Sequence, residues 1–120
     1  VILVIEDDAH IGGLVVQVLR EAGFAPALVS DVRAAREWGN QGNKPAAVIS
    51  DLTVAGSSGP AQLPAELGEI FAGAPLALMT GVPPRRRAAL GVNHERIIEK
   101  PFELEALIAT VHSMVTAPRP

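Results

Sequence analysis

The chain begins with VILVIEDD, residues 1–8, in which five apolar residues lead directly into three carboxylates. Four of the five apolar residues are β-branched, which favours a strand, and a run without polar alternation is typical of a strand buried on both faces. The neighbouring carboxylates of Glu6, Asp7 and Asp8 repel one another, so a cluster of this kind usually needs a cation or a nearby base. We therefore expect a divalent metal ion at the end of this strand.

Strand and helix patterns alternate along the rest of the chain. Apolar residues at helical spacing predict a first helix over residues 11–19, which Gly23 would end. The alternation predicts a parallel sheet covered by helices on both faces, and Pro26, which cannot donate a ladder hydrogen bond, places the second strand at an edge. Further strands are expected over residues 25–29, 46–50, 76–79 and 96–98, and further helices over 31–38, 60–72, 84–90 and from 104 onward.

Size and composition limit the possible functions. The 120 residues correspond to one domain, which we place over residues 1–120. A formal charge of -3, from 10 basic and 13 acidic residues, argues against direct binding to nucleic acid. No apolar run is long enough for membrane insertion and the chain has no cysteine, so we expect a cytoplasmic location. Because the chain starts within a strand pattern and without Met, we expect it to be part of a longer polypeptide.

Polar residues follow the apolar strands: the acidic triplet at 6–8, then Asp51, Thr80 and Lys100. In a doubly wound sheet ligands bind outside the carboxyl ends of the strands, so these side chains should converge. Several carboxylates with one hydroxyl and one ammonium make an oxygen-rich site for Mg²⁺, with a nucleophile and two groups for phosphoryl oxygens. This set indicates phosphoryl transfer. A single Asp after a strand is more often a helix cap, which is our interpretation of Asp31.

Four motifs in this order, VIEDD, VISD, LMTG and IEKPF, resemble those of the receiver domain of two-component response regulators. The resemblance covers the whole chain. It implies an α/β, flavodoxin-like (CheY-like) fold, a doubly wound five-stranded parallel sheet in the order 2-1-3-4-5 with five helices on two faces. In that order the second strand lies at the edge, where Pro26 also places it.

The resemblance also implies roles for individual residues. Asp51 would be the phosphoacceptor, while Thr80 and Lys100, the latter before a Lys-Pro bond that is usually cis in the family, would bind phosphoryl oxygens. Asp8 would only follow the acidic pair, and it fits a helix-start acid equally well. The groups expected to hold Mg²⁺ are Glu6 through water, Asp7, Asp51 and the backbone carbonyl of Thr53.

A receiver domain implies a phosphorylation-dependent switch in a two-component phosphorelay, which accepts a phosphoryl group from phosphohistidine onto Asp51. Its partner would be a histidine kinase or a histidine phosphotransfer protein, and the sequence does not name a downstream target. Such a domain catalyses its own phosphorylation and dephosphorylation and turns over no external substrate. The stretches LMTG and KPFELEALIATVHSMV especially resemble receivers of hybrid histidine kinases, in which case the parent protein would be a histidine kinase.

Some positions depart from the family pattern. Ile97 stands three residues before Lys100, where many receivers have a Tyr or Phe that switches together with the residue at position 80, and the chain has no Tyr. We infer that phosphorylation moves the fourth helix without a ring flip or is read out on another face. Ala55 stands four residues after Asp51, where the family usually has Pro. The run RRR at residues 85–87 is interpreted as the solvated face of a short helix rather than a nucleic-acid patch.

Two other functions compete with this interpretation. Haloacid dehalogenase-type phosphatases use similar groups, but their nucleophilic Asp follows the first strand, and a second Asp lies two residues after it. Here Asp51 follows the third predicted strand, and the residue two positions after it is Thr53. The other alternative is a pseudo-receiver, an interaction module that keeps the fold and works without phosphate, and it is motivated by Ile97 and the altered loop after Asp51.

Overall fold

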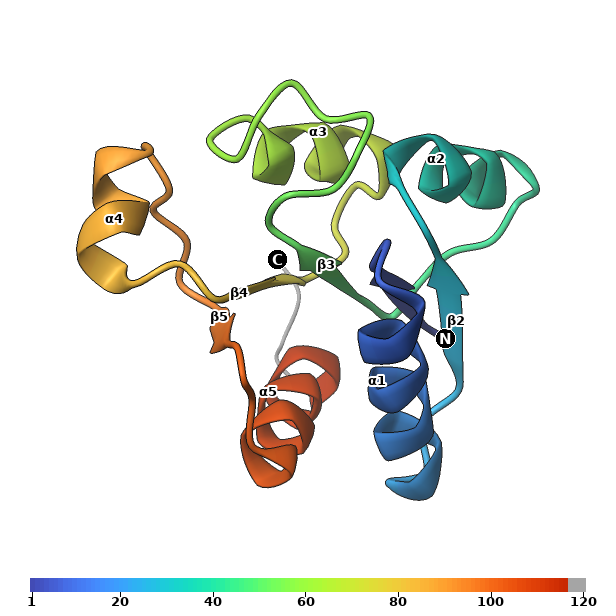
Figure 1. Ribbon diagram of the computed structural model, residues 1–120. Helices are drawn as coiled ribbons and strands as arrows, with labels where there is room; N and C mark the ends of the chain where they lie inside the picture. Colours follow the sequence, from blue (N-terminus) through green and yellow to red (C-terminus); the bar gives the residue numbers. More distant parts are fainter. Residues whose placement is uncertain (117–120) are drawn as a thin grey trace.

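The computed structural model describes residues 1–116 and alternates strands with helices throughout (Figure 1), as the sequence patterns predicted. The last four residues of the predicted 1–120 domain lie outside the described part. The strands are β1 (Ile2–Ile5), β2 (Pro26–Val29), β3 (Ala47–Asp51), β4 (Leu76–Thr80) and β5 (Ile97–Glu99). The helices are α1 (Ala9–Glu21), α2 (Val32–Asn40), α3 (Leu63–Ile70), α4 (Pro84–Ala89) and α5 (Leu104–Thr116).

The strands of residues 1–116 form one parallel sheet in the order β2-β1-β3-β4-β5. This confirms both the α/β class predicted from the alternation and the strand order that the resemblance implied. Ile2 of β1 pairs with Pro26 on one side and with Ala47 of β3 on the other. Pro26 therefore lies in an edge strand, where its missing N–H removes no hydrogen bond from the middle of the sheet.

Helices cover both faces of the sheet. Figure 1 shows α1 and α5 together on one face and α2 and α3 on the other. The side chains of β1 alternate between these layers: Val4 packs in the cluster under α1 and α5, whereas Leu3 and Ile5 pack in the cluster under α2 and α3. Because both faces are covered, every position of β1 is buried, which explains the continuous apolar run at the start of the sequence.

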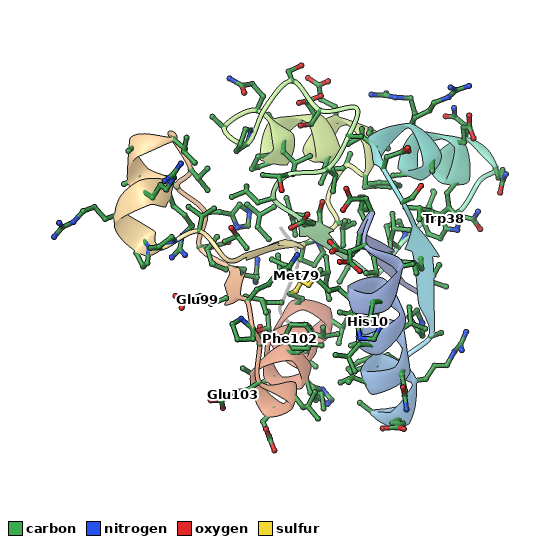
Figure 2. All side chains as sticks on the ribbon, in the orientation of Figure 1. His10, Trp38, Met79, Glu99, Phe102 and Glu103 are labelled. Atoms are coloured by element: carbon green, nitrogen blue, oxygen red, sulfur yellow. The ribbon has the colours of Figure 1, made fainter. Side chains whose placement is uncertain are left out.

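The α1 and α5 layer is packed through large aliphatic side chains. Leu19 of α1, Leu107 and Val111 of α5 and Met79 of β4 belong to one buried cluster, and Figure 2 shows Met79 between the sheet and α5. Full burial of a side chain of this size stabilises the fold by about 1.5–3 kcal/mol. Among residues 1–116, no helix combines the length and the apolar character that a bilayer span requires.

Aspartates cap two of the helices. The Asp8 carboxylate accepts hydrogen bonds from the N–H groups of His10 (2.9 Å) and Ile11 (3.2 Å), and Asp31 accepts one from Ala34 (2.7 Å). The cap predicted for Asp31 is confirmed. Of the two interpretations that the sequence left open for Asp8, the structure supports the helix-start acid. The third carboxylate of the triplet is thereby directed to α1.

The structure corrects some predicted boundaries. The third helix begins at Leu63 rather than at residue 60, because residues 60–62 form a turn in which the N–H groups of Gln62 and Leu63 donate to the Gly59 carbonyl. The helix ends at Ile70 rather than at residue 72. Gly59 has φ 136°, a backbone conformation that favours glycine. The last strand covers Ile97–Glu99, one residue later than predicted, and Asp51 is the final residue of β3 rather than the residue after it.

Helix α4 has six residues and buries none of them, and Figure 1 shows it standing apart from the other helices. Arg85 and Arg86 are exposed on it, as predicted for a solvated face. The prediction is wrong for Arg87, whose side chain is only 13% exposed. Its guanidinium reaches backward to the loop before the helix, which the linear pattern of three arginines could not indicate.

The capping contact of Asp31 yields a test of the fold. Asp31→Ala removes the side-chain acceptor at the start of α2 and should lower the free energy of unfolding by about 1 kcal/mol in urea denaturation. Arg33→Ala is the control, because its ion pair with Glu37 lies on the exposed surface of the same helix and contributes little. Equal losses from both substitutions would contradict the capping role.

Candidate functional site

The predicted polar residues meet at the carboxyl edge of the sheet. Glu6 and Asp7 directly follow β1, Asp51 ends the neighbouring β3, and Lys100 directly follows β5. Parallel strands bring these ends together although the residues are far apart in sequence. Hydrogen bonds continue the sheet past β1 and at β5: the Glu6 N–H donates to the Val29 carbonyl, and the Lys100 N–H donates to the Thr80 carbonyl (2.8 Å).

Lys100 bridges two of the carboxylates. Its Nζ lies 2.9 Å from Asp51 Oδ1 and 3.3 Å from Glu6 Oε1, and the peptide bond that follows it is cis. The Glu6 side chain is only 1% exposed and that of Asp51 11%, whereas Lys100 retains 20% exposure. The ammonium group therefore compensates charges that are largely removed from water.

Three carboxylates could hold a cation together. Glu6, Asp7 and Asp51 each offer an oxygen, and these oxygens lie within 4.8 Å of one another. Two oxygens bound directly to one Mg²⁺ are at most about 4.2 Å apart, and Mg²⁺ usually keeps several waters that bridge longer gaps. The buried Glu6 Oε2 makes no hydrogen bond within the described chain. An all-oxygen donor set with a free buried acceptor fits a hydrated Mg²⁺ ion.

The cluster holds more negative than positive charge, with three carboxylates beside one ammonium group. Burial raises the pKa of Glu6, and the nearby charge of Asp51 raises it further, while Lys100 acts in the opposite direction. Burial alone would lower the pKa of Lys100, but its hydrogen bond to Asp51 and the two carboxylate charges raise it above its ordinary value. The ammonium is thus firmly protonated near neutral pH, and the site favours additional positive charge.

The sequence also predicted roles for Thr80, Thr53 and Ile97. The Thr80 hydroxyl accepts a hydrogen bond from the Val82 N–H (2.9 Å), and the Thr53 hydroxyl makes a long contact of 3.5 Å with Asp51 Oδ2. Ile97 is half-buried in β5 and packs against the cluster under α2 and α3. Within residues 1–116 no hydrogen bond joins the side chains of Thr80 and Asp51, although both residues lie at the ends of the paired strands β3 and β4.

Sequence reasoning missed one polar residue of the site. Ser50 is fully buried, and its hydroxyl donates to the carbonyl of Asp51 (2.9 Å). This bond satisfies a buried hydroxyl and fixes the peptide that carries the Asp51 side chain. A serine at the end of the otherwise apolar run AAVIS was the available signal.

The bridging geometry makes a prediction about stability. Lys100→Met keeps the aliphatic stem but leaves the carboxylates without their counter-charge, so in EDTA it should lower the free energy of unfolding by about 1–3 kcal/mol. Added Mg²⁺ should restore more stability to the variant than to the unaltered protein, because the cation replaces the missing charge. Urea denaturation with and without Mg²⁺ measures both effects.

Lys44→Met is the matched control, since Lys44 is exposed and lies before the start of β3, whereas Asp51 lies at the other end of that strand. It should leave the response to Mg²⁺ unchanged. An equal gain from Mg²⁺ in the Lys100→Met variant and the unaltered protein would mean that the ammonium and the cation do not compensate the same carboxylates.

Comparison with known proteins places this chain in a family. The family model described as the response regulator receiver domain matches residues 2–112. A response regulator receiver protein from Sinorhizobium medicae is 28% identical with a TM-score of 0.79, and the alignment covers 97% of this chain and 94% of that one. No curated protein matches the chain.

Two further structures share the fold. The receiver domain of NtrX from Brucella abortus is 24% identical with a TM-score of 0.84, covering 98% of this chain and 100% of that one. The signal receiver domain of a signal transduction histidine kinase from Syntrophus aciditrophicus is 22% identical with a TM-score of 0.78, covering 96% and 89%. The match over residues 2–112, on a sheet in the order 2-1-3-4-5, shows that the chain belongs to the response regulator receiver domain family.

Proposed function

We propose that this domain is a phosphorylation-dependent switch in which Asp51 accepts a phosphoryl group from a phosphohistidine. The contact that carries the proposal is the bridge from Lys100 Nζ to Asp51 (2.9 Å) and Glu6 (3.3 Å), beside a cluster of three carboxylates able to share a cation. This arrangement supports the roles that the sequence predicted for these residues. Membership of the receiver family supports signalling by phosphorylation.

The proposed reaction transfers one phosphoryl group. An Asp51 carboxylate oxygen forms a bond to phosphorus while the bond to the histidine nitrogen breaks, and the nitrogen leaves with the electron pair. Both the nucleophile and the phosphoryl group are negatively charged, so positioning and charge neutralisation supply most of the catalysis. Lys100 is placed to neutralise charge on a phosphoryl oxygen, since its ammonium already contacts Asp51.

A divalent cation belongs to this proposal. Asp7, Asp51 and the Thr53 carbonyl would hold Mg²⁺, with Glu6 reaching it through water. When bound, the ion would supply the second positive charge needed on the phosphoryl oxygens. Glu6 Oε1 accepts the hydrogen bond from Lys100 Nζ, and the burial of Glu6 holds its carboxylate and the Lys100 ammonium in one orientation.

Thr80 is proposed to sense the product. Its hydroxyl accepts a bond from Val82 in this structure, so the hydroxyl proton remains free to be donated. Donation to a phosphoryl oxygen on Asp51 would draw Thr80 and the loop after β4 toward the site, which shifts an existing conformational equilibrium. Ile97, in place of an aromatic residue, is proposed as the adjoining switch position.

The alternatives are less well supported. A haloacid dehalogenase-type phosphatase would have its nucleophile after the first strand and an acid two residues on, whereas Asp51 ends β3 and Thr53 occupies that place. A phosphate-independent pseudo-receiver would have no need to keep Lys100 in contact with Asp51 and Glu6. The preserved charge set therefore favours a phosphoryl acceptor.

The partner proposed is a histidine kinase or a histidine phosphotransfer protein, which would supply the phosphoryl group. Direct binding to nucleic acid is not proposed, because the net charge is -3. We also propose a cytoplasmic location and a place within a hybrid histidine kinase, which would make the parent protein the kinase.

Phosphoryl uptake tests the proposal directly. Incubation with acetyl phosphate and Mg²⁺ should add one phosphoryl group to the protein, seen by intact mass, and Asp51→Asn should abolish the addition. The same substitution should leave the free energy of unfolding unchanged or raise it, because it relieves repulsion among crowded carboxylates.

Asp8→Asn is the matched control. Asn caps a helix about as well as Asp, and Asp8 caps α1 here, so this variant should be labelled like the unaltered protein. Labelling of the Asp51→Asn variant would refute the assignment of the phosphoacceptor. An unaltered protein that takes up no phosphate, beside a control receiver that does, would favour the pseudo-receiver.

A further inference from the structure

Three consecutive arginines on α4 have different environments. Arg85 and Arg86 are exposed, but the Arg87 side chain is only 13% exposed. Its Nη1 donates to the Val82 carbonyl (2.8 Å), and its Nη2 lies 3.8 Å from Glu99 Oε1. A guanidinium removed from water needs partners of this kind, so its position is specified by the loop and not by the helix surface.

The same loop residue contacts the proposed sensor of the site. The Val82 N–H donates to Thr80 Oγ1 (2.9 Å) while the Val82 carbonyl accepts from Arg87. Val82 is therefore held on both sides, by a side chain at the end of β4 and by one from α4. A continuous chain of hydrogen bonds runs from Thr80 through Val82 to Arg87.

The local backbone favours transmission of a displacement along this chain. Pro83 and Pro84 directly follow Val82, and both have a backbone φ fixed by their rings. The Arg87 N–H donates to the Pro83 carbonyl (2.9 Å), and the Arg87 carbonyl accepts from the buried residue Val92 (2.9 Å). With the loop stiffened in this way, a movement of Val82 is passed to α4 rather than absorbed.

The contact with Glu99 is the weaker of the two side-chain contacts. The Glu99 side chain is 67% exposed and extends outward from β5 (Figure 2), so solvent screens the pair at 3.8 Å. The bond to the Val82 carbonyl is shorter, charge-assisted and shielded by the burial of Arg87. The link between the loop and α4 therefore depends mainly on Val82.

We propose that Arg87 is the positioning residue that couples the state of Asp51 to α4, taking the place of the aromatic ring that is absent at Ile97. The proposal rests on the proposed function, since it requires phosphorylation of Asp51. Thr80 can donate its proton to a phosphoryl oxygen while still accepting from Val82, so the loop moves with Thr80. Arg87 follows the Val82 carbonyl and carries α4 with it.

The first experiment compares two arginines on the same helix. Amide NMR shifts are recorded with and without acetyl phosphate and Mg²⁺ for the unaltered protein, Arg87→Met and Arg86→Met. All three should take up phosphate at Asp51 by intact mass. The shifts of the α4 amides on phosphorylation should be lost in Arg87→Met and kept in Arg86→Met, while shifts next to Asp51 persist in both.

An α4 response in Arg87→Met as large as in the unaltered protein would overturn the proposal. Arg87→Lys keeps one positively charged donor for the Val82 carbonyl, so its α4 response should be smaller than that of the unaltered protein without being lost. This variant replaces Arg87→Met in both experiments if the Met variant does not fold, and an undiminished α4 response in it would then overturn the proposal.

A second experiment tests the same link without phosphate. Amide hydrogen exchange of Leu90 and Val92 is measured in Thr80→Val, in Arg87→Met and in the double variant. Each single substitution breaks the chain at Val82 and should speed exchange by about fivefold to tenfold. The double variant should exchange no faster than the quicker single variant, because either substitution alone already interrupts the chain of hydrogen bonds from Thr80 to Arg87.

Multiplicative effects in the double variant would overturn the proposal. If the unaltered protein takes up no phosphate, the proposed function fails, and this cycle alone decides whether Arg87 links Thr80 to α4. Exchange in Arg86→Met should match the unaltered protein, because its side chain is exposed.

Discussion

The structure depends on one electrostatic constraint, the crowding of carboxylates at the carboxyl edge of a parallel sheet. Glu6 is almost fully buried within a few ångströms of Asp51 and Asp7, which would be unfavourable without compensation. Lys100 supplies one positive charge and satisfies one oxygen of each buried carboxylate. Among residues 1–116, Glu6 Oε2 has no hydrogen-bond partner, so this oxygen can accept a further bond. Burial, followed by the charge of Asp51, raises the pKa of Glu6 despite the presence of Lys100. A site with this excess of negative charge favours binding of a cation, and the bound cation would in turn stabilise a phosphoryl group.

The fold maintains this crowding through its buried strands. β1 and β3 are buried throughout, and their adjacent ends fix Glu6 and Asp51. The hydrogen bond from the Lys100 N–H to the Thr80 carbonyl fixes the backbone of the lysine. Helix α4, by contrast, buries none of its six residues. The rigid layers thus position the chemistry, and the least packed element is the one available to respond.

The fold and most of the site could be predicted because they depend on local patterns. Apolar runs identify buried strands, and a polar residue at the end of each run identifies the crevice, which is why Asp51 and Lys100 could be named from the sequence. Arg87 could not be recognised, because its burial depends on the shortness of α4 and the path of the loop. Similarly, the turn at residues 60–62 depends on the backbone of Gly59, and no local pattern distinguishes Asp8 as a cap from Asp7.

The most direct test of the central claim is a crystal structure of the domain with Mg²⁺ and beryllofluoride, a mimic of the phosphoryl group. We expect beryllium to bond to Asp51, Lys100 to contact a fluorine, and the cation to lie between Asp7 and Asp51. A structure in which Mg²⁺ binds elsewhere, or in which beryllofluoride bonds to a residue other than Asp51, would contradict this claim.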